Sequence, residues 1–250
     1  MMMYNDKKFI NKDTVSFYAN TNEEFIKKPV KGIIIEFPGL DGGSCIGGTL
    51  PCATYDTEWT RRFAEKGILV AYLFPGPWSW GRKGVCRIAE AVIEAFADKY
   101  NLCKDFPLAA CGGSMGGVGT VMFSSQTKLK LRAAAIACPC VDASDRLTCH
   151  PEFPRTYISA VAGLDMEFEE GLREISPIHC IDKMPDIPYF ICSDGEDEVF
   201  PEEQCDMYVE KLKEAGRNIE YYRQPQMKHG EFLPEVRERL HSFLEDAILK

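Results

Sequence analysis

Residues 108–120 read LAACGGSMGGVGT, an apolar run that passes directly into a glycine-rich turn around Ser114. Within this stretch residues 112–116 fit the pattern G-x-S-x-G, and residues 118–123 begin a segment with helical spacing. Such a turn holds a serine in a strained conformation at the end of a strand, where a Cβ two residues away on either side would collide with backbone. The stretch therefore predicts a strand, a tight turn and a helix, with Ser114 as nucleophile or, alternatively, as an idle serine.

Short apolar runs alternate with amphipathic segments of helix length along most of the chain. The runs expected as strands are 32–37, 68–74, 108–111, 133–138, 189–192 and 219–223, and the main helices are expected at 56–66, 87–100, 202–215 and 234–249. An early antiparallel hairpin is expected from residues 15–19 and the segment around Phe25. The alternation is typical of βαβ units and predicts an α/β fold with a mostly parallel central sheet flanked by helices.

The alternation stops between about Val141 and Met184. This stretch contains no clear strand and several short helical fragments, as insertions that cover a site often do. No internal repeat, low-complexity tract or linker rich in Pro, Gly and Ser appears. We therefore expect residues 1–250 to form a single domain, with a small lid-like insertion at about 141–184.

Composition limits the partners of this protein. The chain has 250 residues, of which 45% are hydrophobic, and a formal net charge of −9. No apolar stretch approaches the roughly 18 residues of a membrane span, and the polar N-terminal residues do not resemble a secretory signal. Acidic residues spread along the whole chain disfavour binding to nucleic acid and to anionic membranes, because phosphates would be repelled. A small-molecule partner is expected, and the sequence leaves room for a homo-oligomer.

Eleven cysteines raise the question of disulfides and metals. Their number is odd, and Cys111, Cys138, Cys140 and Cys192 fall in or beside strand-like apolar runs, which predicts reduced core thiols and a cytoplasmic location. A zinc set of Cys138, Cys140, Cys149 and His150 is conceivable, but its spacing matches no paired-ligand pattern. We expect no metal and no cofactor.

A serine nucleophile requires a base within hydrogen-bond reach. Of the four histidines, His241 lies in the terminal helical segment, and His150 and His179 lie in the insertion. His229 instead follows the last predicted strand in a loop, and loops at the carboxyl ends of parallel strands are where such sheets carry their sites. His229 is therefore the candidate base, and a surface loop histidine is the alternative.

The base in turn needs an acid that orients it. The loop after residues 189–192 carries four carboxylates within residues 194–198. Most of them would be solvated whether or not one of them orients the base. Asp197 is preferred because the sequence D-x-V-x-P beginning there places Pro201 as the first residue of the next helix, where a missing N–H costs nothing. Asp194 is expected to satisfy backbone donors of the same turn.

Acyl transfer also requires donors for the oxyanion of the tetrahedral intermediate. The backbone N–H groups of Met115 and of Leu40, in the loop of residues 37–43, are the candidates, and a plain Pro-Gly turn is the alternative for that loop. Trp78 and Trp80 follow another predicted strand. They are expected to line the substrate pocket or, with equal weight, to fix their loop to the core.

Taken together, these residues resemble those of single-domain esterases of the α/β-hydrolase fold, particularly those similar to the catalytic domain of the prolyl oligopeptidase family. The likeness covers about Lys31 to the C-terminus and rests on GGSMGG around Ser114, Ser176-Pro177, Met184-Pro185, DEVFP from Asp197, KEAG at 213–216 and His229-Gly230. The chain departs from the family in having Pro38-Gly39 where His-Gly is frequent and Asp194 where Gly is usual. The resemblance implies a catalytic triad of Ser114, Asp197 and His229, in the α/β-hydrolase order, with Leu40 and Met115 as oxyanion donors.

The expected function is hydrolysis of carboxylic esters of small substrates through an acyl-enzyme. A small peptidase or amidase with the same triad is the first alternative, and matched esters and aminoacyl amides would separate the two. An N-terminal propeller domain that would select peptides by size is not expected, which favours the ester. A non-catalytic binding protein on the same fold is disfavoured because every triad residue is present.

Overall fold

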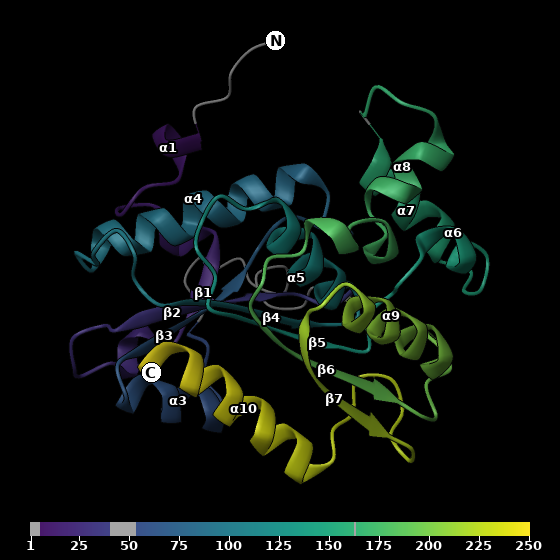
Figure 1. Cartoon of the computed structure of the whole chain (residues 1–250). Helices are drawn as coiled ribbons and strands as arrows, with labels where there is room; N and C mark the ends of the chain where they lie inside the picture. Colours follow the sequence, from purple (N-terminus) through teal and green to yellow (C-terminus); the bar gives the residue numbers. More distant parts are fainter. Residues whose placement is uncertain (1–5, 41–53, 163) are drawn as a thin grey trace.

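A seven-stranded sheet forms the centre of the molecule (Figure 1). The computed structural model describes residues 6–40, 54–162 and 164–250. The strands are β1 (Ala19–Thr21), β2 (Gly32–Phe37), β3 (Ile68–Leu73), β4 (Leu108–Gly113), β5 (Ala133–Ala137), β6 (Pro188–Asp194) and β7 (Asn218–Gln224). They lie in the order β1-β3-β2-β4-β5-β6-β7, in which β1 pairs antiparallel with β3 and every other pair is parallel.

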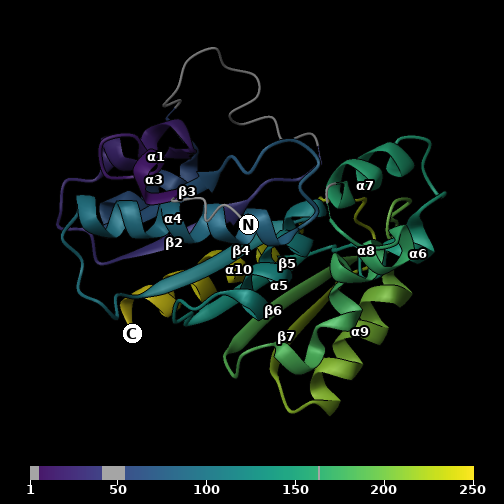
Figure 2. The same ribbon diagram turned by 90° about the horizontal axis from the view of Figure 1, so that it is seen from above.

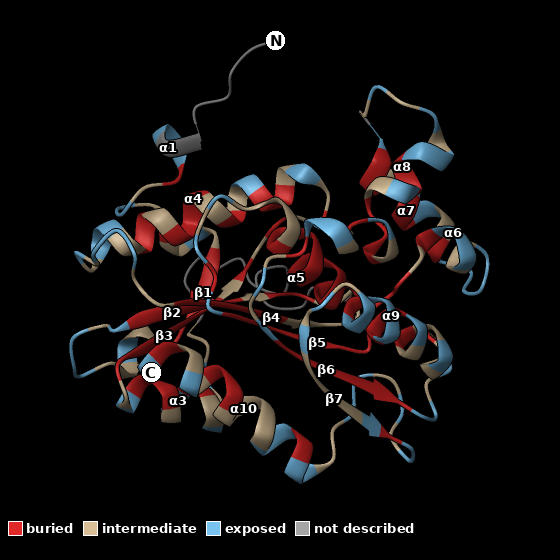
Figure 3. Ribbon diagram, in the orientation of Figure 1, coloured by how far each residue is buried: buried red, intermediate tan, exposed pale blue. Residues whose placement is uncertain are grey.

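Helices cover both faces of the sheet (Figure 1). One face carries α4 (Lys83–Lys99), α5 (Met115–Gln126) and α9 (Glu202–Glu214), and the other carries α3 (Glu58–Glu65) and α10 (Pro234–Leu249). Along β2, Ile33 and Ile35 pack into the first core, whereas Ile34 packs into the second. Parallel strands buried on both faces have to be apolar at successive positions, which explains the continuous apolar runs of β3 and β5, whereas the edge strand β7 is mostly exposed or half-buried (Figure 3). The architecture is that of the α/β-hydrolase fold, as predicted.

The predicted insertion is helical. It contains α6 (Ala143–Arg146), α7 (Phe153–Val161) and α8 (Phe168–Glu174), followed by the 3₁₀ turns η3 (Pro177–His179) and η4 (Ile181–Lys183). Figure 2 shows α6, α7 and α8 gathered at one side of the molecule, away from β2 and β3. The insertion therefore lies beside the strands whose carboxyl ends carry the predicted site.

The predicted N-terminal hairpin is wrong. The first described elements are α1 (Asp6–Phe9) and the 3₁₀ turns η1 (Val15–Phe17) and η2 (Glu23–Phe25), and β1 pairs with β3 instead. The reason is Asn22, whose fully buried side chain donates to the carbonyls of Thr60 and Ile68 and accepts from the amide of Val70. These three bonds satisfy backbone groups of α3 and β3 and fix the segment there.

Two further expectations concern reduced cysteines in the core and the lack of a membrane-spanning segment. All nine cysteines in the described ranges are free, and Cys111, Cys138, Cys140 and Cys192 are buried as predicted. Cys45 and Cys52 lie outside the described residues. Within the same ranges, none of the helices combines the length and apolar character needed to cross a bilayer.

Candidate active site

Ser114 lies in the sharp turn between β4 and α5. Its backbone has φ 57° and ψ −127°, and its N–H donates to the carbonyl of Ala137 at 2.9 Å. A Cβ on Gly112 would lie 2.5 Å from the carbonyl oxygen of Gly116, and a Cβ on Gly116 would collide with the carbonyl of Phe37. The two glycines therefore allow a turn that projects the serine from the carboxyl end of β4. Helix α5 begins at Met115, three residues earlier than the clear helical pattern.

One chain of hydrogen bonds connects the three residues predicted as a triad. His229 Nε2 lies 2.8 Å from Ser114 Oγ, and His229 Nδ1 lies 2.7 Å from Asp197 Oδ2. The Asp197 side chain is fully buried, whereas that of His229 is 23% exposed. The ring of Phe200 meets the imidazole edge-on at 5.3 Å. The serine, the imidazole and the carboxylate are thus in contact, with the acid shielded from water.

The second carboxylate oxygen of Asp197 is held by its own loop. Asp197 Oδ1 accepts from the amides of Val199 at 2.7 Å and Phe200 at 2.8 Å. Because these donors fix Oδ1, the carboxylate presents Oδ2 to the imidazole of His229.

Asp194 occupies a different position. Its Oδ1 accepts from Gln224 Nε2 and its Oδ2 from the amide of Gly230, each at 2.8 Å, and Gln224 Oε1 accepts from the amide of Leu233. Burial raises the pKa of the Asp194 carboxyl above its ordinary value. This carboxylate therefore fastens the loop that carries His229. Gln224 and Gly230 were not predicted for the site, and a buried glutamine ending an edge strand is the signal that could have identified the first.

The loop after β2 lies beside the nucleophile turn. Gly39 and Leu40 line the same cavity as the nucleophile, and a Cβ on Gly39 would lie 4.0 Å from the carbonyl oxygen of Gly113. Met115 is the first residue of α5, so its N–H has no acceptor within the helix. The rest of the predicted loop, residues 41–43, is outside the described residues.

The cavity at Ser114 has a volume of about 550 Å³. Trp80 lines it and is 1% exposed, with its indole N–H donating to Thr156 Oγ1 at 3.1 Å and its ring 4.4 Å from that of Tyr157. Trp78 is not among the described residues that line this cavity, and its ring instead lies beneath the guanidinium of Arg155.

The insertion adds three residues that were not predicted for the pocket. His150, Glu152 and Phe153 line the cavity, and the Phe153 ring stacks on Phe200 at 5.7 Å. No sequence pattern identifies these three residues, because only the three-dimensional path of the insertion brings them to the cavity.

The cysteines conceived as a zinc set are spread out. Cys140 faces the core, with its sulfur 3.3 Å from the Tyr157 hydroxyl, and Cys149 is exposed. Among the described residues, the group that could hold a metal is a different one. One ligand atom each of Cys138, Asp197 and His229 lie within 4.8 Å of one another.

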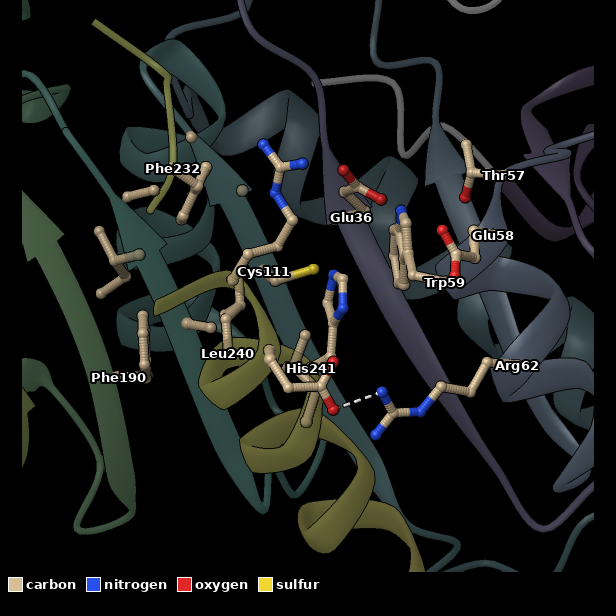
Figure 4. Close-up of a pocket in the computed structure, with 18 of the residues that line it drawn as sticks. Glu36, Thr57, Glu58, Trp59, Arg62, Cys111, Phe190, Phe232, Leu240 and His241 are labelled. Carbon is tan, nitrogen blue, oxygen red and sulfur yellow. Dashed lines mark hydrogen bonds and ion pairs between the residues drawn. The ribbon is translucent and has the colours of Figure 1, made fainter. Parts of the chain in front are cut away.

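A second and larger cavity, of about 680 Å³, lies on the α3/α10 face of the sheet (Figure 4). His241 stacks on Trp59 at 5.2 Å within it. The two cavities share lining residues, among them Glu36 and Phe232. Burial raises the pKa of Glu36 to about 7, while a hydrogen bond from Tyr55 lowers it by a smaller amount. Like Asp194, Glu36 is a perturbed acid without a part in the predicted chemistry.

Comparisons place this architecture among known proteins. No curated protein matches the sequence. Among solved structures, the fold is similar to the acylaminoacyl peptidase of Pyrococcus horikoshii (TM-score 0.70, 17% identity, covering 90% of this chain and 39% of that one). It is also similar to a puromycin-hydrolyzing peptidase of Mycobacterium tuberculosis (TM-score 0.69, 20% identity, covering 89% of this chain and 35% of that one). A third similar structure is esterase B of Lactobacillus rhamnosis (TM-score 0.63, 12% identity, covering 89% of this chain and 76% of that one).

The chain spans well under half the length of the two peptidases, and at these identities the likeness concerns the fold. The sequence itself is more specific. Residues 80–248, more than half of the chain, match the prolyl oligopeptidase family. The chain therefore belongs to the prolyl oligopeptidase family of serine hydrolases.

Proposed function

We propose that this protein hydrolyses carboxylic esters of small substrates through an acyl-enzyme. Ser114 attacks the ester carbonyl while His229 Nε2 takes its proton, and the imidazolium then returns that proton to the leaving alcohol. Asp197 holds the imidazole in the tautomer that keeps Nε2 free to accept, and it stabilises the imidazolium. Water repeats the sequence on the acyl-enzyme and releases the acid.

The observation that carries the proposal is the continuous hydrogen-bond chain from Asp197 through His229 to Ser114. Each contact is of the length expected of a nucleophile, a base and an orienting acid. The full burial of Asp197 strengthens its electrostatic effect on the imidazole, because no water competes for the carboxylate.

The oxyanion donors proposed are the N–H groups of Leu40 and Met115. The support is their location, since Leu40 lines the cavity at Ser114 and the amide of Met115 begins a helix directly after the nucleophile. A helix N-terminus adds a partial positive charge at the place where the negative charge develops.

The ester is preferred for a reason of charge. Trp80, Phe153 and Phe200 give the cavity apolar aromatic walls that suit an uncharged acyl or alcohol group. The carboxylate of Glu152 also lines the cavity, and it could receive the ammonium group of an aminoacyl substrate. One of its oxygens is already paired with Arg155 at 3.0 Å, however, and this positive charge weakens the attraction of Glu152 for an ammonium group. Cleavage of aminoacyl amides is therefore the second candidate, and Glu152 is the observation in its favour.

The test compares turnover of p-nitrophenyl butyrate with that of alanine p-nitroanilide. We expect the larger kcat/KM for the butyryl ester, and Ser114→Ala should reduce it by roughly 10⁴-fold or more. Faster cleavage of the alanyl anilide would establish the second candidate instead.

Glu152→Gln separates the two candidates further. For an esterase the variant should leave butyryl ester turnover near wild type, whereas for an aminoacyl amidase it should raise KM for the alanyl substrate alone. Glu169→Gln, which removes an exposed acid of α8 outside the cavity, is the matched control. If no substrate is turned over and a fluorophosphonate does not label Ser114, the protein is a binding protein on the same fold.

A further inference from the structure

Cys138 lies beside two residues of the proposed triad, Asp197 and His229. It is the first residue after β5, has φ 34°, and its N–H donates to the carbonyl of Cys192 at 2.8 Å. Its side chain is 3% exposed, yet it lines the cavity that contains Ser114. The thiol is therefore fixed in place and can still be reached from the substrate cavity.

A thiol, a carboxylate and an imidazole converge at this point. One ligand atom each of Cys138, Asp197 and His229 lie within 4.8 Å of one another. Metal–ligand bonds of about 2.0–2.3 Å put neighbouring ligands of a tetrahedral ion at roughly 3.3–3.8 Å. To surround one ion, the longest of these separations has to shorten by at most about 1.0–1.5 Å, and the 2.7 Å contact between Asp197 Oδ2 and His229 Nδ1 has to lengthen. The fourth position is then open to water, as at zinc sites with three protein ligands.

The charge of the surroundings also favours a cation. Asp194 adds a second carboxylate against the Cys138 side chain, and the whole chain carries a formal charge of −9. Thiolate and imidazole ligands select zinc and similar thiophilic ions over magnesium and calcium.

We propose that Cys138, Asp197 and His229 form an inhibitory site for a thiophilic divalent cation, Zn²⁺ or Cd²⁺. The inhibition rests on the proposed function, because its target is the triad, but the binding does not. The cation replaces the thiol proton of Cys138, which is released to water, and it takes a carboxylate oxygen of Asp197 and the nitrogen of His229 that faces Asp197.

That nitrogen is Nδ1, since Nε2 faces Ser114. With the ion on Nδ1, the imidazole proton moves to Nε2 through the solvent, so one proton in total leaves the protein. An Nε2–H cannot accept the proton of Ser114, and the nucleophile is no longer activated. Because the ion lies on the far side of the imidazole from Ser114, we expect kcat to fall while KM stays unchanged.

The experiment is a Cd²⁺ titration of chelator-treated protein, followed by ester turnover and by the ultraviolet thiolate-to-cadmium charge-transfer band. The wild-type protein should lose activity as the band grows, and EDTA should reverse both changes. Cys138→Ser should hydrolyse the ester without metal, lack the band, and need at least about tenfold more Cd²⁺ for inhibition. Cys149→Ser, which removes an exposed thiol of the insertion, should behave as the wild type.

Ser114→Ala separates this inference from the proposed function. This variant keeps all three ligands, so its charge-transfer band should match the wild type although it has no turnover. A band that persists in Cys138→Ser, or Cd²⁺ inhibition that competes with substrate, would overturn the inference, as would the absence of a band from the wild-type protein. If Cys138→Ser does not fold, Cys138→Ala serves in its place.

Discussion

Replacing Asp197 by Asn tests the proposed role of the acid directly. Oδ1 of Asp197 accepts from two backbone amides, so the oxygen of an asparagine would stay in that position and its NH₂ would point to His229. An NH₂ donor requires an acceptor at His229 Nδ1, which forces the ring proton to Nε2, opposite Ser114 Oγ. The base is then blocked, and we expect kcat to fall by as much as ~10⁴, or about 5.4 kcal/mol of transition-state stabilisation.

Asp194→Asn is the matched comparison, because it changes the same group only three residues away. Both oxygens of Asp194 accept hydrogen bonds from donors, Gln224 Nε2 and the amide of Gly230. An asparagine NH₂ would face one of these donors and leave it unsatisfied, which costs about 1–3 kcal/mol of stability. Gln224 cannot turn to compensate, because its Oε1 already accepts from the amide of Leu233.

The assay measures kcat with an activated ester and the free energy of unfolding by urea denaturation, for both variants and the wild type. The reasoning predicts a folded but inactive Asp197→Asn and a less stable Asp194→Asn that retains most of its turnover. If Asp194→Asn is folded and inactive while Asp197→Asn stays near wild type, the roles of the two carboxylates have to be exchanged.

Four further outcomes are expected. A fluorophosphonate should label the protein once, at Ser114, by peptide mapping, and label that persists in Ser114→Ala would identify another nucleophile. Hydrolysis should be unchanged in EDTA and in mild reductant; activity lost in EDTA and restored by zinc would refute a metal-free mechanism. Gly116→Ala should cost about 3 kcal/mol or prevent folding, because its Cβ meets the carbonyl of Phe37, and an unchanged Tm would contradict this. The folded protein holds the proton of Glu36 up to pH about 7 whereas the unfolded chain loses it near 4.5, so wild-type stability falls as pH rises through this window. The free energy of unfolding of Glu36→Gln, measured by urea denaturation, should therefore rise by about 2–3 kcal/mol relative to that of the wild type as the pH goes from 5 to 8. The same pH dependence in both proteins would show that the pKa of Glu36 is not raised.

The parts of the fold that could be predicted depend on local rules. The G-x-S-x-G turn at Ser114 is predictable because its glycines are required by backbone contacts within a few residues and with the neighbouring strand. The terminal helix was predicted with its observed bounds, Pro234–Leu249, because proline marks its first turn. His229 could be selected because it follows a strand, and parallel strands place such loops at one edge.

The parts that could not be predicted depend on distant contacts. The N-terminal segment resembles a hairpin locally, but Asn22 binds backbone groups 38 to 48 residues further along the chain. The second cavity has a similar origin. Ala135 and Ala137 indicate a buried strand, and only the position of α10 above them decides that their small side chains leave an open space.

The insertion contacts the loop that carries the acid of the proposed triad. Arg146 of α6 donates to the carbonyl of Val199, and Phe153 of α7 stacks on Phe200. Val199 and Phe200 also supply the amides that hold Asp197 Oδ1. Any displacement of α6 or α7 is therefore expected to disturb the loop that holds the Asp197 carboxylate.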